Sequence, residues 1–153
     1  LLLILMVVGA CAGSTGGGCK VVRFLVLRRQ VQAETLRLLH PRATVTARMN
    51  GRAIGPDVMD SASAFLVLYL LIMTSATLAI TAFGHPKLDV MSAFSGVVAC
   101  LSNVGPGLGA LGPVENFAWL PAGVKWVLSF CMLAGRLELF AVFLLFVPGS
   151  WRR

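Results

Sequence analysis

Residues Ser61 to Phe83 read SASAFLVLYLLIMTSATLAITAF, a run of 23 residues without a charged side chain. As an α-helix this run is about 34 Å long, because each residue adds about 1.5 Å. A transmembrane helix must cross a hydrocarbon core about 30 Å thick. The run therefore predicts a membrane-spanning helix over 61–83 and places the chain among integral membrane proteins.

Two further apolar segments follow this span. Val124 to Val147 predicts a second spanning helix, with tryptophan and basic residues at both of its ends, as expected at membrane interfaces. Leu88 to Ser102 is shorter, about 22 Å as a helix, which is not enough for a full crossing. Asp89 suits the start of this helix, while Gly105 and Pro106 end it. We therefore expect a re-entrant half-helix over 88–102 that enters the membrane and returns.

Two glycine-rich loops follow short apolar stretches: AGSTGGG over 12–18 and NVGPGLG over 103–109. Irregular backbone is tolerated within a membrane only where protein buries it or where it lines a water-filled path. Both loops are therefore candidates for an ion or solute filter. Aligning Gly13 with Gly105 places an apolar half-helix ending before each loop, which predicts that the first loop belongs to an earlier copy of the same repeat.

The bulk composition agrees with a membrane protein. The chain is 58% hydrophobic and 12% charged, with a mean hydropathy of +0.86. Its formal net charge is +7, but eight of the thirteen basic residues lie between Lys20 and Arg52, and two more end the chain. Such clusters mark the cytoplasmic side of membrane spans. Phe24 is the only aromatic residue interleaved with the basic ones, whereas nucleic-acid binding would favour several. We expect the lipid bilayer as a partner and no nucleic acid.

No motif in the chain predicts an enzyme. GSTGGGCK, over 13–20, lacks the Gly-Lys-Ser/Thr ending of a phosphate loop, and GLGALG, over 107–112, is followed by proline rather than a helix. No nucleophile with a base and no paired carboxylates appear, and Cys11, Cys19, Cys100 and Cys131 lack metal-ligand spacing. We therefore expect neither catalysis nor a cofactor.

The segment between the first loop and the first span is basic and polar. Val21 to Leu27 is an apolar run interrupted by Arg23, and it is either a surface-lying helix or a broken helix facing a wet cavity. We favour the broken helix, because Lys20 and Arg23 are three residues apart and share a face. Residues 43–49 favour β-structure and precede Asn50-Gly51, which predicts a small cytoplasmic hairpin within a connector over 33–60.

Arg136 lies near the middle of the predicted span over 124–147. An arginine at the centre of a membrane helix costs about 2.5–3.5 kcal/mol on insertion scales, so it should face a wet cavity or a partner. Glu138 points to nearly the opposite face and is a poor partner on the same helix. A structural ion pair remains the alternative to a functional role.

The loop GACAGSTGGG (9–18) with the following KVVR, the loop LSNVGPGLGALGP (101–113) and the motif GRLELF (135–140) together resemble the Trk/Ktr/HKT superfamily of potassium transporters, in particular its bacterial Trk-type membrane subunit. The resemblance covers essentially the whole chain. It implies an all-α integral membrane fold built from helix–re-entrant pore loop–helix repeats, as in potassium channels. Residues 1–32 would end the third repeat, 33–60 form the connector and 61–153 make the fourth repeat, while the first two repeats lie elsewhere in the same protein.

The resemblance implies potassium uptake, with the ion as substrate held by backbone carbonyls near Gly13 and Gly105. Glycine reaches the dihedral angles that turn carbonyls toward an ion without penalty. The implied filter residues are Ala12, Gly13, Ser14, Asn103, Val104, Gly105 and Pro106, and the implied gating or permeation residues are Arg136 and Lys20.

It further implies a multi-pass homodimer in the bacterial inner membrane, bound to a cytoplasmic nucleotide-binding regulatory subunit. The alternative is a non-conducting membrane scaffold or accessory subunit.

Overall fold

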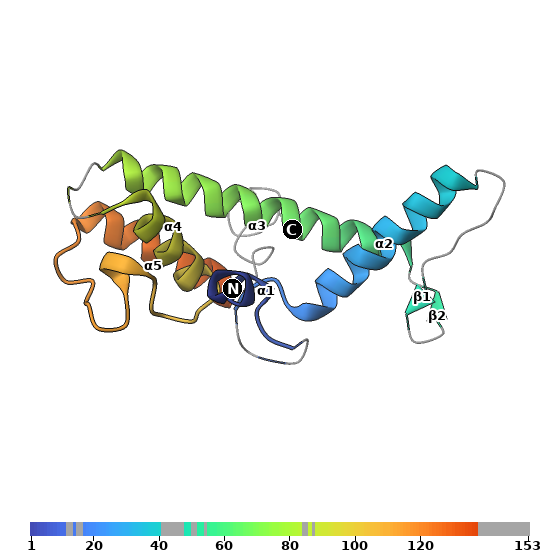
Figure 1. Cartoon of the computed structure of the whole chain (residues 1–153), viewed down its shortest axis with the longest axis horizontal. Coiled ribbons are helices and arrows are strands. Elements are labelled where there is room, and N and C mark those ends of the chain that lie inside the picture. Colours follow the sequence, from blue (N-terminus) through green and yellow to red (C-terminus); the bar gives the residue numbers. More distant parts are fainter. Residues whose placement is uncertain are drawn as a thin grey trace, which may run out of the picture.

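The computed structural model describes residues 1–11, 14, 17–40, 48–49, 52–53, 55–83, 86 and 88–137, and this part of the chain is predominantly helical. Its elements in chain order are α1 (Leu2–Val8), α2 (Val21–Leu39), β1 (Arg48–Met49), β2 (Arg52–Ala53), α3 (Pro56–Ala82), α4 (Val90–Leu101), the short 3₁₀ helix η1 (Gly109–Leu111) and α5 (Ala122–Arg136). Helix α3 runs along the molecule, with α4 and α5 packed against its C-terminal part and α2 against its N-terminal part (Figure 1).

Helix α3 contains the predicted span and begins at Pro56 rather than at Ser61. Proline in the first turn, followed by Asp57, favours this earlier start because proline suits the first helical position and a carboxylate suits the positive helix end. The hydroxyl groups of Thr74 and Thr77 donate to carbonyls one turn earlier, at 2.9 and 2.7 Å. Asp57–Ala82 is long and apolar enough to cross a membrane.

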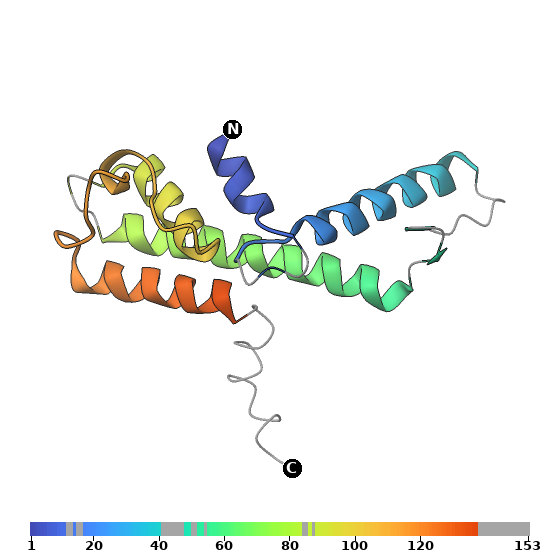
Figure 2. The same cartoon turned by 90° about the horizontal axis from the view of Figure 1, so that it is seen from below.

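Helix α4 lies within the predicted half-helix over 88–102 and is about 18 Å long. It starts near the C-terminal end of α3 and runs back alongside that helix (Figure 2). The chain then returns to the end at which α4 began, where α5 starts. Asp89 is the N-cap residue of α4, as its position in the sequence predicts.

Helix α5 covers the first part of the predicted span over 124–147. Its buried residues, Val124, Leu128, Cys131 and Ala134, recur every three or four positions and form one face against α3 and α4. Residues 138–147 lie outside the described part, so the full length of this span stays a prediction.

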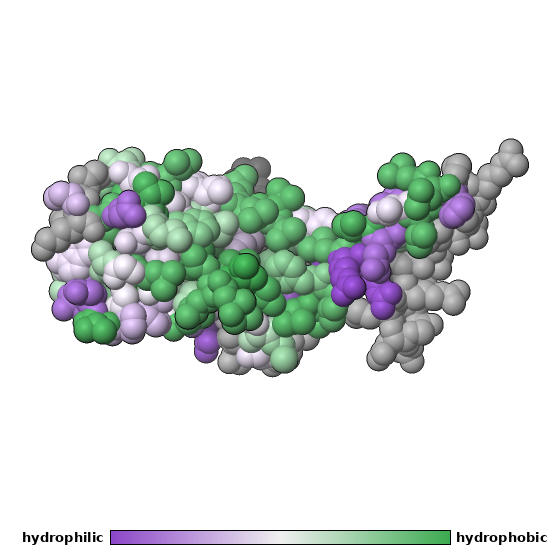
Figure 3. Space-filling view, viewed as in Figure 1, coloured by the Kyte–Doolittle hydropathy of each residue, from purple (hydrophilic) through white to green (hydrophobic). Residues whose placement is uncertain are grey.

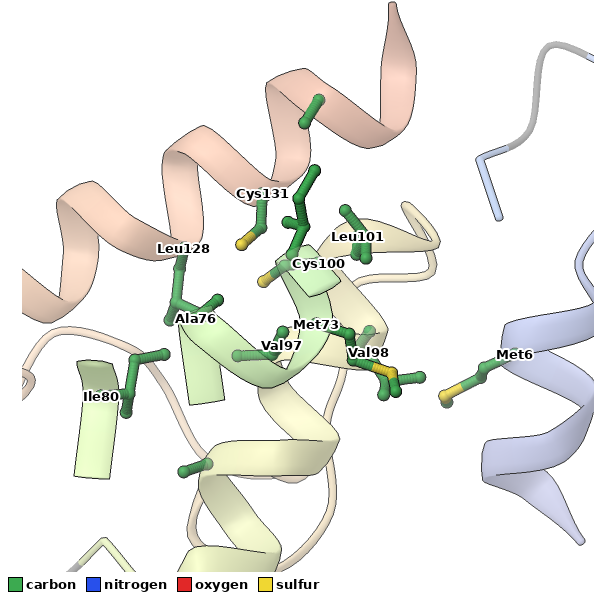
Figure 4. Close-up of a cluster of buried hydrophobic side chains, with 14 of the residues drawn as sticks. Met6, Met73, Ala76, Ile80, Val97, Val98, Cys100, Leu101, Leu128 and Cys131 are labelled. Atoms are coloured by element: carbon green, nitrogen blue, oxygen red, sulfur yellow. The ribbon is translucent and has the colours of Figure 1, made fainter. Parts of the chain in front are cut away.

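The core is centred on α4, whose residues from Ser95 to Leu101 are all buried. Leu128 and Cys131 of α5, Ala76 of α3, and Val97 and Cys100 of α4 belong to one cluster of buried side chains, which is shown in Figure 4. Met6 of α1 approaches the same cluster from the other side. Small side chains on α4 allow three helices to approach it closely, as is usual in membrane helix packing.

Helix α2 is continuous from Val21 to Leu39, so the predicted break in this helix is wrong. The division between the third repeat and a connector beginning at residue 33 stays a prediction. No glycine or proline interrupts the segment. The positive charge of Arg23, which indicated the break, lies close to an aromatic ring of another helix. The guanidinium carbon of Arg23 is 3.8 Å from the ring centroid of Phe65 on α3. This cation–π contact accommodates the arginine on an unbroken helix.

Strands β1 and β2 pair antiparallel, with Arg48 opposite Ala53 and Met49 opposite Arg52. They flank the Asn50-Gly51 pair that predicts the hairpin. The turn itself lies outside the described residues, and the cytoplasmic position of the strands stays a prediction.

The surface of the helical body is largely apolar, whereas hydrophilic side chains gather over part of α2 (Figure 3). On α3, the side chains of Val67, Leu71 and Leu78 are between 56% and 70% exposed. Trp126 on α5 is 77% exposed. An apolar outer face of this extent favours contact with lipid over contact with water.

Candidate functional site

The loop over 103–109 begins where the backbone turns sharply at the C-terminal end of α4. Asn103 has a φ of 55°, which is the left-handed conformation common just beyond helix ends. The N–H groups of Val104 and Gly105 both donate to the carbonyl of Ala99, at 2.9 and 3.4 Å. The N–H of Asn103 donates to Cys100 at 3.1 Å. These bonds fix the start of the loop to the last turn of α4.

Gly105 has a φ of +107°, a conformation that residues with a side chain rarely adopt, and a Cβ atom built there would meet nothing within 4 Å. The need for glycine here is therefore conformational rather than steric. In the described part of the chain, no donor is paired with the carbonyl oxygens of Asn103, Val104 or Gly105. Their lone pairs are available to a cation.

The chain after this loop is hydrogen-bonded to two serine side chains of α4. The N–H of Leu108 donates to Ser95 Oγ at 2.9 Å, and the N–H of Ala110 donates to Ser92 Oγ at 3.3 Å. Gly107 packs on Gly96 of α4, where a Cβ on Gly107 would lie 3.2 Å from the Gly96 Cα atom. The loop is thus held to the half-helix on both sides of Gly105.

The first glycine-rich loop is closed at its base by backbone hydrogen bonds. The N–H of Cys19 donates to the carbonyl of Val7 at 3.2 Å, and the N–H of Val21 donates to that of Ala10 at 3.2 Å. Gly9 and Gly18 have φ values of 71° and 87° and touch one another, since a Cβ on Gly18 would lie 3.1 Å from the Gly9 Cα atom. The two ends of this loop are therefore held close together.

The two glycine-rich loops meet. A Cβ atom on Gly17 would lie 2.8 Å from the carbonyl oxygen of Ser102 and 2.6 Å from Asn103 Nδ2. Gly135 of α5 packs on the same end of α4, where a Cβ atom would overlap the carbonyl oxygen of Leu101 and lie 2.7 Å from Asn103 Nδ2. The first loop and α5, which are far apart in sequence, therefore both pack on the end of α4, and close packing requires glycine in each of them.

The predicted filter residues differ in how far they are exposed. In the second loop, Asn103, Val104 and Pro106 are exposed and Gly105 is half-buried. In the first loop, Ser14 is half-buried and its N–H donates to Cys11 at 3.0 Å. The remaining two predicted residues, Ala12 and Gly13, lie outside the described residues.

The two predicted permeation residues lie at helix ends. Lys20 is half-buried, precedes α2 as its N-cap residue and has a φ of 61°. Arg136 is the last residue of α5 and its side chain is exposed. Because Arg136 directly follows Gly135, its backbone is close to the end of α4.

The structure adds one polar contact that sequence reasoning missed. Tyr69 of α3 and Ser102, the C-cap residue of α4, are 1% and 4% exposed, and their hydroxyl oxygens are 3.1 Å apart. A tyrosine within a predicted span needs a hydrogen-bond partner for its hydroxyl group. Tyr69 could therefore have been identified from the sequence, but Ser102 could not.

Among the described residues, no three histidine, cysteine, aspartate or glutamate side chains are grouped so as to hold a metal ion. The oxygen atoms of the second loop that could bind a cation are backbone carbonyls and the side-chain oxygen of Asn103. Such an arrangement suits a weakly held monovalent cation better than a tightly held divalent one.

Comparison with known proteins finds similarity along the whole chain. A family described as TrkH, cation transport protein, matches residues 1–152. The chain is 43% identical over 152 residues to the Trk system potassium uptake protein TrkH of Salmonella typhimurium, covering 99% of this chain and 30% of that protein. It is 36% identical over 153 residues to the protein of the same name from Halomonas elongata, covering 100% of this chain and 31% of that protein.

The crystal structure of the potassium transporter TrkH from Vibrio parahaemolyticus has a similar fold, with a TM-score of 0.86 and 43% sequence identity. The match covers 99% of this chain and 31% of that structure's chain. The chain thus spans about three-tenths of the length of these relatives.

Proposed function

Because this chain belongs to the TrkH family of cation transport proteins, we propose that it is part of a potassium uptake protein and that its two glycine-rich loops line a selectivity filter. The observation that carries this proposal is the contact between Gly17 of the first loop and Ser102 at the root of the second. Two loops that contribute to one filter must lie side by side. The rest of the filter would come from parts of the protein beyond these residues.

The chemistry of the second loop suits a dehydrated potassium ion. A filter replaces the water around the ion with carbonyl oxygens. The carbonyls of Asn103, Val104 and Gly105 accept no hydrogen bond from other described residues, and so are available for this purpose. Helix α4 also ends at this loop, so its negative dipole end favours a cation there without any carboxylate.

We further propose that α3 crosses the membrane and that α4 with the returning segment over 102–121 forms a re-entrant pore loop. The lengths support this assignment, since α3 is about 40 Å long and α4 only about 18 Å. The basic residues of α2 and of the hairpin strands favour a cytoplasmic position for that end of the molecule. We propose a multi-pass arrangement in the bacterial inner membrane, because the relatives are bacterial potassium uptake proteins.

Arg136 and Lys20 are proposed to act on permeation or gating. Arg136 follows the glycine that packs on the end of α4, so a positive charge lies close to the proposed ion path. Lys20 joins the first loop to α2, and a movement of α2 would reach that loop through this residue. A structural ion pair of Arg136 would leave transport kinetics unchanged when the charge is removed.

The proposed partners are a second copy of the protein and a cytoplasmic nucleotide-binding regulatory subunit. Purification of the full-length protein from the membrane tests both, because a dimer and a co-purifying nucleotide-binding protein are expected. A monomer that binds no such subunit would contradict this part of the proposal.

The filter assignment is tested by Gly105→Ser in the full-length protein, produced in bacteria that lack other potassium uptake systems. A side chain at a φ of +107° strains the backbone, by roughly 1–2 kcal/mol for a left-handed residue. We expect the ratio of potassium to sodium uptake to fall at least about fivefold, which corresponds to ~1 kcal/mol.

The matched control is Gly55→Ser, because a Cβ atom at Gly55 meets nothing within 4 Å and its φ is −64°. This variant should transport as the unmodified protein does. Unchanged selectivity in Gly105→Ser would remove the filter assignment. Absence of potassium uptake by the unmodified full-length protein would instead favour a non-conducting scaffold.

A further inference from the structure

Tyr69 and Ser102 form a buried polar contact at the base of the second glycine-rich loop. Their hydroxyl oxygens are 3.1 Å apart, and Tyr69 is 1% exposed. Most other side-chain hydroxyl groups of α3 bond to carbonyls of their own helix, as those of Thr74 and Thr77 do. The Tyr69 hydroxyl instead reaches a different helix. It therefore links the position of α3 to the end of α4.

The ring of Tyr69 is held by its own neighbours. Phe65, one turn earlier on α3, stacks on it with ring centroids 6.3 Å apart and an interplanar angle of 24°. Arg23 of α2 lies over the Phe65 ring at 3.8 Å. Side chains from α2 and α3 thus fix the direction in which the Tyr69 hydroxyl points.

Ser102 is a point where several segments are tied together. Its N–H donates to the carbonyl of Val98 at 2.9 Å, which keeps it on the last turn of α4. Its carbonyl group is in close contact with Gly17 of the first loop. The next residue, Asn103, turns into the second loop with a φ of 55°. A shift of Ser102 would therefore move both loops relative to one another.

We propose that Tyr69 is a positioning residue that sets ion selectivity by holding Ser102, and with it the start of the second loop, at a fixed distance from the first. This inference rests on the proposed function of the two loops as a filter. Tyr69 does not touch the ion in this proposal, and it acts only through Ser102.

A small displacement of the second loop can change selectivity, because potassium and sodium ions differ little in size. Discrimination between potassium and sodium depends on the spacing or number of carbonyl oxygens around the ion. Tyr69→Phe keeps the ring and its stacking on Phe65 but removes the hydroxyl group. The buried Ser102 hydroxyl group then loses its partner, which is unfavourable. The end of α4 is no longer bonded to α3 and becomes more mobile.

The test measures potassium uptake and sodium uptake by the full-length protein, each normalised to the amount of protein in the membrane. Tyr69→Phe should lower the ratio of potassium to sodium uptake about fivefold, the change that corresponds to loss of one net hydrogen bond. Ser102→Ala removes the same bond from the other side and should give the same change. The double variant should show no further loss.

Thr77→Val is the matched control. It also removes a hydroxyl group from α3, but this hydroxyl group bonds to the carbonyl of Met73 within the same helix. Its selectivity should equal that of the unmodified protein. If Tyr69→Phe lowers the amount of protein in the membrane, the ratio in Ser102→Ala decides the question.

An unchanged ratio in Tyr69→Phe and Ser102→Ala, together with a lowered ratio in Gly105→Ser, would overturn the role of Tyr69 and leave the filter in place. An unchanged ratio in all three variants would overturn the filter assignment itself.

Discussion

Gly17 is the residue at which the contact between the two loops can be tested most directly. In Gly17→Ala the added Cβ atom would lie 2.8 Å from both the carbonyl carbon and the carbonyl oxygen of Ser102. Ordinary contact begins at 3.4 Å, so the two backbones must separate by about 0.6 Å, the difference between these distances.

Ser102 has little freedom to move away from such a methyl group. Its N–H is bound to Val98 on α4, and its hydroxyl group is bound to Tyr69 on α3. The Asn103 amide, 2.6 Å from the same Cβ position, can rotate, but the Ser102 backbone cannot. The first loop must therefore shift. Overpacking of this kind costs about 1–3 kcal/mol. This free energy corresponds to a change of roughly 5- to 150-fold in an equilibrium constant.

We expect Gly17→Ala to lower the rate of potassium uptake by a factor within that range, with protein still present in the membrane. The assay is initial uptake of potassium or rubidium by the full-length protein as a function of external concentration. Gly55→Ala is the control, because a Cβ atom there meets nothing within 4 Å. Uptake by Gly17→Ala equal to that of the control would refute the contact between the loops as a requirement of transport.

Two further predictions follow from the residues around the loop. Ser95→Ala should lower the free energy of unfolding of the purified protein by about 1–3 kcal/mol, because the half-buried N–H of Leu108 loses its acceptor. Thr74→Ala, at an exposed position on α3, should change the free energy of unfolding by less than about 0.5 kcal/mol, and equal changes in thermal or denaturant unfolding would contradict this role of Ser95. Arg136→Ala should raise uptake at limiting potassium, since it removes a positive charge that repels a cation near the proposed ion path, whereas Arg136→Lys keeps the charge and should not; kinetics unchanged by both substitutions would favour a structural ion pair.

Helices α3 and α4 could be predicted because each depends on local composition. An uncharged run long enough to cross a membrane gives α3, and a shorter apolar run between Asp89 and Gly105 gives α4. The same patterns located the second loop, where Gly105 has the positive φ that glycine permits. Residue type and spacing suffice for these features.

Helix α2 could not be predicted correctly from its own residues. Arg23 within an apolar run indicated a break, because an unpaired charge is costly in a membrane. Its partner ring belongs to Phe65, which lies on α3 and far along the sequence. A local pattern carries no information about a contact of this kind, so the continuous helix became evident only in the folded protein.

The sequence by itself determined that the chain belongs in a membrane, where the short helix α4 lies and which glycines begin irregular loops, because hydropathy, helix length and glycine dihedrals are properties of neighbouring residues. Only the tertiary structure decided that Gly17, Ser102 and Gly135 meet at one point and that Tyr69 holds that point from a third helix. The reason is physical: such contacts depend on how closely separate backbones approach, and that distance is set by the packing of the small side chains of α4 against every helix around it.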